Sequence, residues 1–153
     1  MSRGNLLLRM ELRSNPGILC VVREALGKLA ETLGLPESDC RAVVLAVDEA
    51  LANIIRHAYQ GKNEKPIEAS FRRIFVSQNA ARSEALEIIL EDRGITVHRK
   101  NLCGRPLDDL RPGGLGLHLM RESMDKVEFH RRNGRNQLRL LKFLPESKLQ
   151  TSC

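Results

Sequence analysis

Hydrophobic positions recur with two different periods in the first half of the chain, and each period predicts a different element. Residues 5–12 (NLLLRMEL) predict a β-strand. Residues 16–33 carry apolar side chains at helical spacing, with Asn15 placed to cap the helix and Gly34 placed to end it. A second helix is predicted from about residue 38 to Tyr59, because its apolar residues form one broad face.

Strand patterns follow. Residues 67–76 and 85–92 predict two strands that are joined by a polar turn at residues 77–83. From Gly94 to Gly116 the sequence is rich in glycine and proline and shows little periodicity, which predicts a long loop. Loops of that length inside a compact domain are usually lids or binding loops.

The chain after this loop predicts a short helix at about residues 115–124 and two strands at about 126–131 and 137–143. Asn133-Gly134 between these strands is a strong signal for a two-residue hairpin turn. The order of elements predicts an α+β fold: a two-layer sandwich with helices packed on one face of a mixed, mostly antiparallel sheet.

Composition agrees with a single domain over residues 1–153, with a core from about residue 5 to residue 144. Hydrophobic residues make up 42% of the chain and charged residues 29%, as in ordinary soluble globular proteins. No apolar run approaches the roughly 20 residues that a membrane-spanning helix needs, and the start of the chain does not resemble a signal peptide. We therefore predict a cytoplasmic protein. The 4 cysteines form no C-x-x-C pair, which favours neither a zinc site nor a disulfide framework.

The net charge of +6 is compatible with nucleic acid as a partner. Against that hypothesis, the chain has no Trp, 1 Tyr and 4 Phe, so aromatic platforms for stacking bases are scarce. The basic residues are also spread along the sequence. A solvated surface explains them best, and an acidic protein partner or a polyphosphate suits them equally well.

Three clusters carry candidate chemistry. In the second predicted helix, Glu49 and Asn53 stand four residues apart and therefore project from the same side. A carboxylate beside an amide oxygen can hold a divalent cation and orient a hydroxyl, and Mg²⁺ takes few protein oxygens plus water and phosphate. Taken alone, the pair is more often a solvated helix face.

The second cluster is Glu91-Asp92-Arg93-Gly94, at the end of an apolar strand. A carboxylate at that point can accept a hydrogen bond from an amino group, and a glycine lets the backbone pass close to a ligand. A plain strand-ending turn explains the same residues equally well. The third cluster, RPGGLGL at residues 111–117, runs into a helix, where exposed backbone N–H groups favour phosphate.

In this order, the stretches DEALANIIRHAY, EDRG and GGLGLHLMRESMDKVEF resemble the GHKL (histidine-kinase-like) ATPase superfamily. Within it, the chain is most similar to the stand-alone anti-sigma-factor serine/threonine kinase branch, over about residues 5–144. The resemblance implies the Bergerat-type ATP-binding fold. One departure lies after the EDRG turn, where the branch usually has a Pro-Phe pair and this chain has Ile95-Thr96-Val97-His98.

The resemblance also implies a role for each motif. Asn53 would coordinate the Mg²⁺ that bridges the ATP phosphates. Asp92 would accept the adenine amino group, with Gly94 beneath the ring. Glu49 would act as the general base, and residues 95–112 would form a lid over ATP. The remaining ATP-binding residues would surround the phosphates, namely Arg111, Gly113, Gly114, Leu115, Gly116 and Leu117.

By the same resemblance, the chain is expected to be a Mg–ATP-dependent serine kinase. It would phosphorylate a small antagonist of the anti-anti-sigma type and sequester a sigma factor or a similar target, as a homodimer. An alternative is a regulatory module that binds ATP to gate a protein partner without phosphoryl transfer. Nucleic-acid binding is the third hypothesis.

Overall fold

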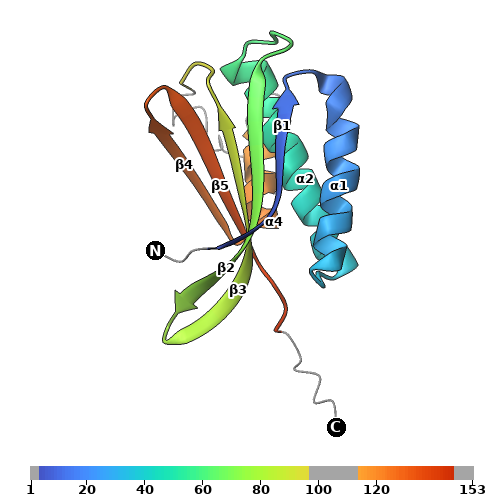
Figure 1. Ribbon diagram of the computed structural model, residues 1–153, viewed down its shortest axis with the longest axis vertical. Helices are drawn as coiled ribbons and strands as arrows, with labels where there is room; N and C mark the ends of the chain where they lie inside the picture. The colour runs from blue at the N-terminus through green and yellow to red at the C-terminus, as the bar shows by residue number, and fades with distance from the viewer. Residues whose placement is uncertain (1–3, 97–113, 147–153) are drawn as a thin grey trace.

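The computed structural model describes residues 4–96 and 114–146. Its strands form one five-stranded sheet in the order β1-β2-β3-β5-β4, and every pairing between neighbours is antiparallel. The helices cover one face of this sheet (Figure 1). The α+β two-layer prediction is thus confirmed, with a sheet that is antiparallel throughout instead of mixed. The strands are β1 (Asn5–Arg13), β2 (Pro66–Gln78), β3 (Ala81–Asp92), β4 (Lys126–Arg132) and β5 (Arg135–Phe143).

The first helical segment begins as the sequence predicts. The Asn15 side chain accepts a hydrogen bond from the backbone N–H of Gly17 at 3.0 Å, and this cap opens a 3₁₀ turn, η1 (Pro16–Ile18). The chain continues into α1 (Leu19–Thr32) and ends at Gly34, which has a φ of +85°. Glycine adopts that left-handed conformation without steric cost, so the helix stops there.

Three further helical segments complete the layer. They are α2 (Glu37–Asn53), a π-helical turn η2 (Ile54–Ala58) and α4 (Gly114–Ser123). Within the described residues, no helix combines the length and the apolar character that crossing a bilayer requires.

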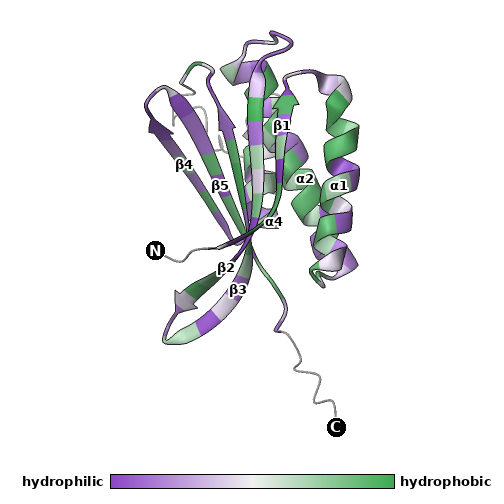
Figure 2. Ribbon diagram, viewed as in Figure 1, coloured by the Kyte–Doolittle hydropathy of each residue, from purple (hydrophilic) through white to green (hydrophobic). Residues whose placement is uncertain are grey.

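The core lies between the sheet and these helices. Apolar residues recur along the strands and helices (Figure 2), and every strand and helix contributes residues to the core cluster or to the partly buried residues packed against it. In β3 the alternate residues Leu86, Ile88 and Leu90 are fully buried, and Leu26 of α1 and Leu51 of α2 pack in the same cluster. This alternation places the next inward position of β3, residue 92, at the edge of the core.

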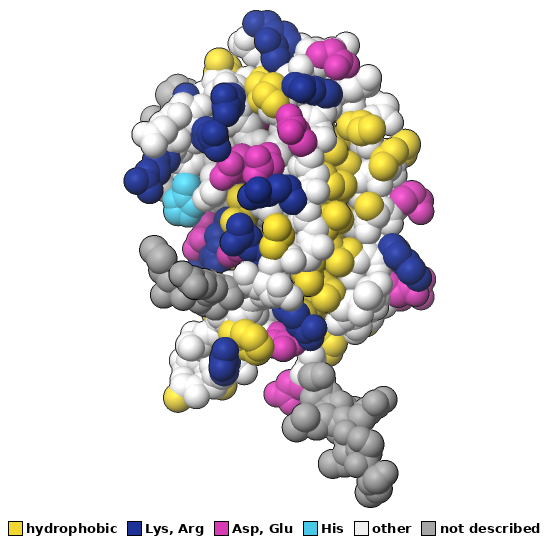
Figure 3. Space-filling view, in the orientation of Figure 1, with side chains coloured by type: hydrophobic (Ala, Val, Ile, Leu, Met, Phe, Trp, Pro, Cys, Tyr) yellow, Lys and Arg dark blue, Asp and Glu magenta, His cyan; other side chains and the backbone are white. Residues whose placement is uncertain are grey.

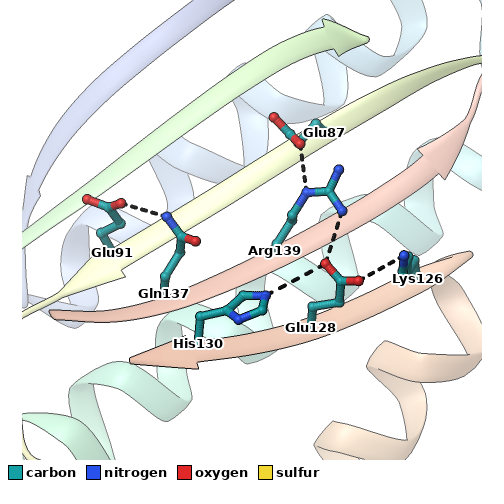
Figure 4. Close-up of polar contacts among 7 residues, drawn as sticks. All are labelled: Glu87, Glu91, Lys126, Glu128, His130, Gln137 and Arg139. Atoms are coloured by element: carbon teal, nitrogen blue, oxygen red, sulfur yellow. Dashed lines mark hydrogen bonds and ion pairs between the residues drawn. The ribbon is translucent and has the colours of Figure 1, made fainter. Parts of the chain in front are cut away.

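The opposite face of the sheet is held together by charged side chains. The Arg139 guanidinium on β5 donates to Glu87 Oε2 on β3 at 2.7 Å and to Glu128 Oε2 on β4 at 3.0 Å (Figure 4). Acidic and basic side chains lie close together over the sheet side of the molecule (Figure 3). Many of the positive charges are therefore neutralised by neighbours on adjacent strands, as a solvated sheet face requires.

The predicted polar turn at residues 77–83 is wrong. Strands β2 and β3 continue to the pair Gln78–Ala81, so the turn holds only Asn79 and Ala80. This end of the hairpin curls away from the helices (Figure 1), and its side chains from Ser77 to Arg82 are exposed. With no core to cover, the strands lose their apolar alternation, and the sequence there resembles a loop.

The two hairpin turns provide a matched stability test. Ala80 and Gly134 are each the second residue of a two-residue turn, with φ of +66° and +73°. We expect Ala80→Gly to raise the free energy of unfolding by about 0.5–1 kcal/mol, because it removes the strain of a side chain in the left-handed region. Gly134→Ala should lower the free energy of unfolding by a similar amount.

Urea denaturation of the two variants and the wild type measures both effects. A Cβ at Gly134 would meet no atom within 4 Å, so backbone conformation alone sets the result there. Equal effects of the same sign in the two variants would contradict this account of the turns.

Candidate functional site

Helix α2 and the π turn η2 form one continuous rod, and the three sequence clusters meet along it. The first cluster lies on α2 itself. The end of β3 contacts the rod at Ala58, and the first turn of α4 contacts it at Glu49. The axial distance from Glu49 to Ala58 is roughly 13 Å at about 1.5 Å per residue. Segments that are far apart in the sequence thus form two ends of one site.

The contact at the α4 end involves Glu49 and Gly116. A Cβ added at Gly116 would overlap the Glu49 carboxylate at Oε2. The glycine therefore leaves the space that the carboxylate fills, directly beside the N-terminal turn of α4. Backbone N–H groups in the first turn of a helix have no partner within the helix, so negative charge is favoured there.

Asn53 lies one turn beyond Glu49 on the same rod. Its side-chain oxygen Oδ1 is buried and has no hydrogen-bond partner in the described part of the chain. An acceptor left in that state costs about 1–3 kcal/mol, unless a ligand fills it. Oxygen is the ligand atom that Mg²⁺ prefers. Among residues 4–96 and 114–146, no group of three or more His, Cys, Asp or Glu side chains could hold a metal ion.

The π turn η2 begins directly after Asn53. The backbone N–H of Tyr59 donates to the carbonyl of Ile54 at 2.9 Å, five residues earlier, where an α-helix would use the residue four earlier. Single π turns inside α-helices occur frequently at functional sites. The sequence predicted an uninterrupted helix to Tyr59. It missed the π turn because Ile54, Ile55 and Ala58 are buried in either geometry.

Asp92 ends β3 as a buried carboxylate at the opposite end of the site. Its Oδ1 accepts hydrogen bonds from the backbone N–H of Gly94 and from Asn136 Nδ2, both at 2.8 Å. Burial raises the pKa of this carboxyl above its usual value, and the two hydrogen bonds and the nearby Arg131 only partly offset that effect. A buried carboxyl with a raised pKa is a candidate functional group.

Gly94 packs against the end of η2. A Cβ at this position would overlap the backbone carbonyl of Ala58, and the next residue, Ile95, donates its N–H to the same carbonyl at 2.9 Å. The turn after β3 therefore lies directly on the rod that carries Glu49 and Asn53. The structure brings Glu49, Asn53, Asp92, Gly94 and Gly116 to this one rod.

Comparison with known proteins identifies the family. A family model described as the histidine kinase-like ATPase domain matches residues 12–142. The chain belongs to this family.

Within the family, the chain falls in the branch of anti-sigma-factor serine kinases. It is 29% identical over 136 residues to a protein named serine-protein kinase RsbW from Bacillus pumilus, which covers 84% of this chain and 80% of that protein. It is 31% identical to an RsbW from Bacillus licheniformis, with 83% and 80% covered. The family resemblance that the motifs predicted is confirmed.

A solved structure shows the same fold. The crystal structure of the RsbU and RsbW domains of a Mycobacterium tuberculosis protein matches with a TM-score of 0.58 at 15% identity. The match covers 90% of this chain and 33% of that one.

The structure describes only some of the other predicted site residues. Two of them, Arg111 and Gly113, lie outside the described residues. The same is true of the predicted lid, residues 95–112, from Val97 onward. Gly114 and Leu115 are the first two residues of α4. The Leu117 side chain is buried in the core, so Leu117 can meet a ligand only through its backbone.

Sequence analysis missed Tyr59 as a structural part of the site. Its hydroxyl donates to the carbonyl of Pro66 and accepts the backbone N–H of Arg93 at 2.9 Å. Burial also raises the pKa of this phenol. The side chain thereby ties the end of η2 to the strand end that carries Asp92. The sequence feature that could have pointed to Tyr59 is its position in the segment His57-Ala58-Tyr59, at the end of the first motif.

Sequence analysis also missed Asn136 and Arg131, on the β4–β5 hairpin. Both side chains reach the turn after Asp92, where Asn136 binds the carboxylate and Arg131 binds Asn136. In the sequence, Arg131 is one of several scattered basic residues and Asn136 is a polar residue beside a turn. The pairing of β5 with β3 places Asn136 opposite Asp92, and the pairing of β4 with β5 places Arg131 opposite Asn136.

The two glycine contacts predict different responses to the same substitution. We expect Gly94→Ala to lower the free energy of unfolding by about 1–3 kcal/mol, because the new methyl group meets the rigid backbone of Ala58. Gly116→Ala should change the free energy of unfolding by at most about 1 kcal/mol. Its methyl group meets the mobile end of Glu49, and alanine favours the helix.

Urea denaturation followed by circular dichroism compares the two variants with the wild type. A loss in Gly116→Ala as large as that in Gly94→Ala would show that the Glu49 carboxylate is held rigidly, contrary to this account.

Proposed function

We propose that this chain is a Mg–ATP-dependent protein serine kinase of the anti-sigma-factor type. The observation that supports it most directly is the placement of Glu49 and Asn53 on successive turns of α2, with the Glu49 carboxylate against the first turn of α4. In this proposal, the Glu49 carboxylate and the Asn53 amide oxygen would face the phosphates of bound ATP.

In this proposal, the adenine end of ATP lies at the turn after β3. Oδ1 of Asp92 is already occupied by two N–H donors, so Oδ2 is the oxygen left to accept the adenine amino group. Gly94 has no side chain to cover the backbone beside it, which suits a flat base lying on the turn.

The phosphate end lies between Asn53 and the start of α4. Asn53 Oδ1 is a buried oxygen without a hydrogen-bond partner among the described residues, and it fits a Mg²⁺ ion that keeps most of its ligands as water and phosphate. When bound, such an ion neutralises charge on the transferring phosphoryl group. Backbone N–H groups at Gly114, Leu115 and Gly116 would face phosphate oxygens, because these residues belong to the first turn of the helix.

Glu49 is the proposed general base. Its carboxylate would accept the proton of a serine hydroxyl as the hydroxyl oxygen attacks the terminal phosphate. A positioned base of this kind contributes about 10²–10⁴-fold to the rate. Gly116 supports this role by leaving space in which the carboxylate lies beside α4.

The proposed protein substrate is a small antagonist of the anti-anti-sigma type, and the proposed sequestered target is a sigma factor or a similar regulator. Similarity to proteins named serine-protein kinase RsbW supports this choice. The net charge of +6 suits an acidic partner. We further propose that the chain acts as a homodimer in the cytoplasm.

Two substitutions separate the proposed roles of base and metal ligand. Glu49→Gln removes the base and keeps the shape of the side chain. We expect it to bind Mg–ATP with nearly wild-type affinity and to lose serine phosphorylation by about 10²–10⁴-fold. Asn53→Ala should lose most of the Mg²⁺-dependent part of nucleotide affinity. Calorimetry and transfer of labelled phosphate to the antagonist protein measure the two effects.

If Glu49→Gln transfers phosphate at the wild-type rate, the general-base assignment is wrong. If the wild type binds Mg–ATP and changes its affinity for a partner without transferring phosphate, the alternative of an ATP-gated regulatory module replaces the kinase.

The ionisation of Asp92 predicts a pH dependence. Burial raises the pKa of Asp92. Below that pKa the carboxyl holds a proton, which falls on Oδ2 because Oδ1 accepts two N–H groups. A protonated Oδ2 is a hydrogen-bond donor and a poorer acceptor for the adenine amino group. ATP affinity should therefore fall as the pH drops through the raised pKa, a transition that Asp92→Asn should lack.

Calorimetric titrations at a series of pH values compare the two proteins. An identical pH dependence in the wild type and Asp92→Asn would contradict the role of Asp92, since Arg131 and Tyr59, its charged and titratable neighbours, are present in both proteins.

A further inference from the structure

The amide of Asn136 joins the β4–β5 hairpin to the turn that follows Asp92. Its Nδ2 donates to Asp92 Oδ1 at 2.8 Å and to the carbonyl of Ile95 at 3.0 Å, with a longer contact of 3.4 Å to the carbonyl of Gly94. One side chain thus holds the carboxylate and two backbone carbonyls of the same turn.

Arg131 fixes which way this amide points. Its Nη1 donates to Asn136 Oδ1 at 2.6 Å and to the carbonyl of Gly94 at 3.3 Å. A guanidinium has donors and no acceptor, so it can face only the oxygen of the amide. The NH₂ group of Asn136 must then face Asp92 and the carbonyls of the turn.

This arrangement determines what Asp92 can offer to a ligand. Gly94 N–H and Asn136 Nδ2 both bind Oδ1, which sets the orientation of the carboxylate and leaves Oδ2 without a donor among residues 4–96 and 114–146. Without the Asn136 amide, only the local bond from Gly94 would hold the carboxylate, and it could turn about its side-chain torsion.

We propose that Asn136, held in place by Arg131, is a positioning residue that makes Asp92 selective for the 6-amino group of adenine. The inference rests on the proposed function, because it assigns the basis of nucleotide choice at the same site. The proposed role of Asn136 is to discriminate between purine bases. The β4–β5 hairpin does not need the Asn136 side chain in order to fold. Strands β4 and β5 have their own turn at Asn133-Gly134 and their own core residues, Leu138 and Leu140.

The test compares affinities for ATP and for inosine triphosphate, which carries a carbonyl oxygen where adenine has the 6-amino group. The wild type should prefer ATP strongly, because a site built to bind a hydrogen-bond donor rejects an analogue that lacks it. In Asn136→Ala we expect the ratio of the two affinities to fall by roughly ten-fold. Most of the change should be in ATP binding.

Gln137→Ala is the matched control. Gln137 is the next residue on β5, and it donates to Glu91 Oε1 at 2.8 Å on the opposite face of the sheet (Figure 4). The control should keep the wild-type ratio. Arg131→Ala removes the anchor of the amide, together with the longer contact to the Gly94 carbonyl, and should lower the ratio in the same direction as Asn136→Ala. This second variant decides the matter if Asn136→Ala does not fold.

Four outcomes would overturn the inference. If Asn136→Ala, or Arg131→Ala in its place, weakens both nucleotides equally, the residue is merely structural. If the control changes the ratio as much, the effect belongs to the sheet as a whole. If the wild type binds ATP without preferring it to inosine triphosphate, Asp92 does not read the amino group. If the wild type binds neither nucleotide, the proposed function fails together with this inference. In the other outcomes the wild type still binds ATP, so the two failures can be told apart.

Discussion

The close approach of the α2–η2 rod to two other segments is the constraint on which the whole site depends. At one end the turn after β3 lies on the carbonyl of Ala58, and at the other end the first turn of α4 lies on the carboxylate of Glu49. Both contacts are possible only because Gly94 and Gly116 lack a Cβ. The distance between the two ends is set by the rise of the helix, which leaves little freedom in where a ligand can lie.

The rest of the molecule supports these two contacts. The sheet holds β3 in the centre, with β2 and β5 on either side, so the position of Asp92 is fixed by pairing along the whole strand. Tyr59 and the β4–β5 hairpin hold the turn beyond it from two directions. Three buried side-chain polar atoms in the described residues lack a hydrogen-bond partner, and of these only the Asn53 oxygen belongs to the candidate site residues; the others are Asp48 Oδ1 and Arg72 Nε. A folded protein tolerates an unsatisfied buried acceptor at a site where a ligand supplies the missing interaction.

The sequence predicted most of the fold because apolar residues recur at every second position in most of the strands and at helical spacing in the helices. The prediction failed at the β2–β3 turn, where exposed strand residues carry no apolar pattern. It also failed at η2, because the apolar residues of that turn fit the hydrophobic pattern of an α-helix. For the site, Glu49, Asn53, Asp92 and the glycines were predicted because they stand in local motifs. Asn136 and Arg131 were not, because their part depends on strand pairing between segments about 40 residues apart, which no local pattern encodes.

The most direct test of the account is to map which backbone amides respond when the wild-type protein meets Mg–ATP. Nuclear magnetic resonance chemical-shift mapping does this without any substitution. The account predicts that the largest shifts fall in three separate stretches of sequence: around Asn53, from Asp92 to Ile95, and at the start of α4. Shifts confined to the outer face of the sheet, or no saturable shifts at all, would contradict it.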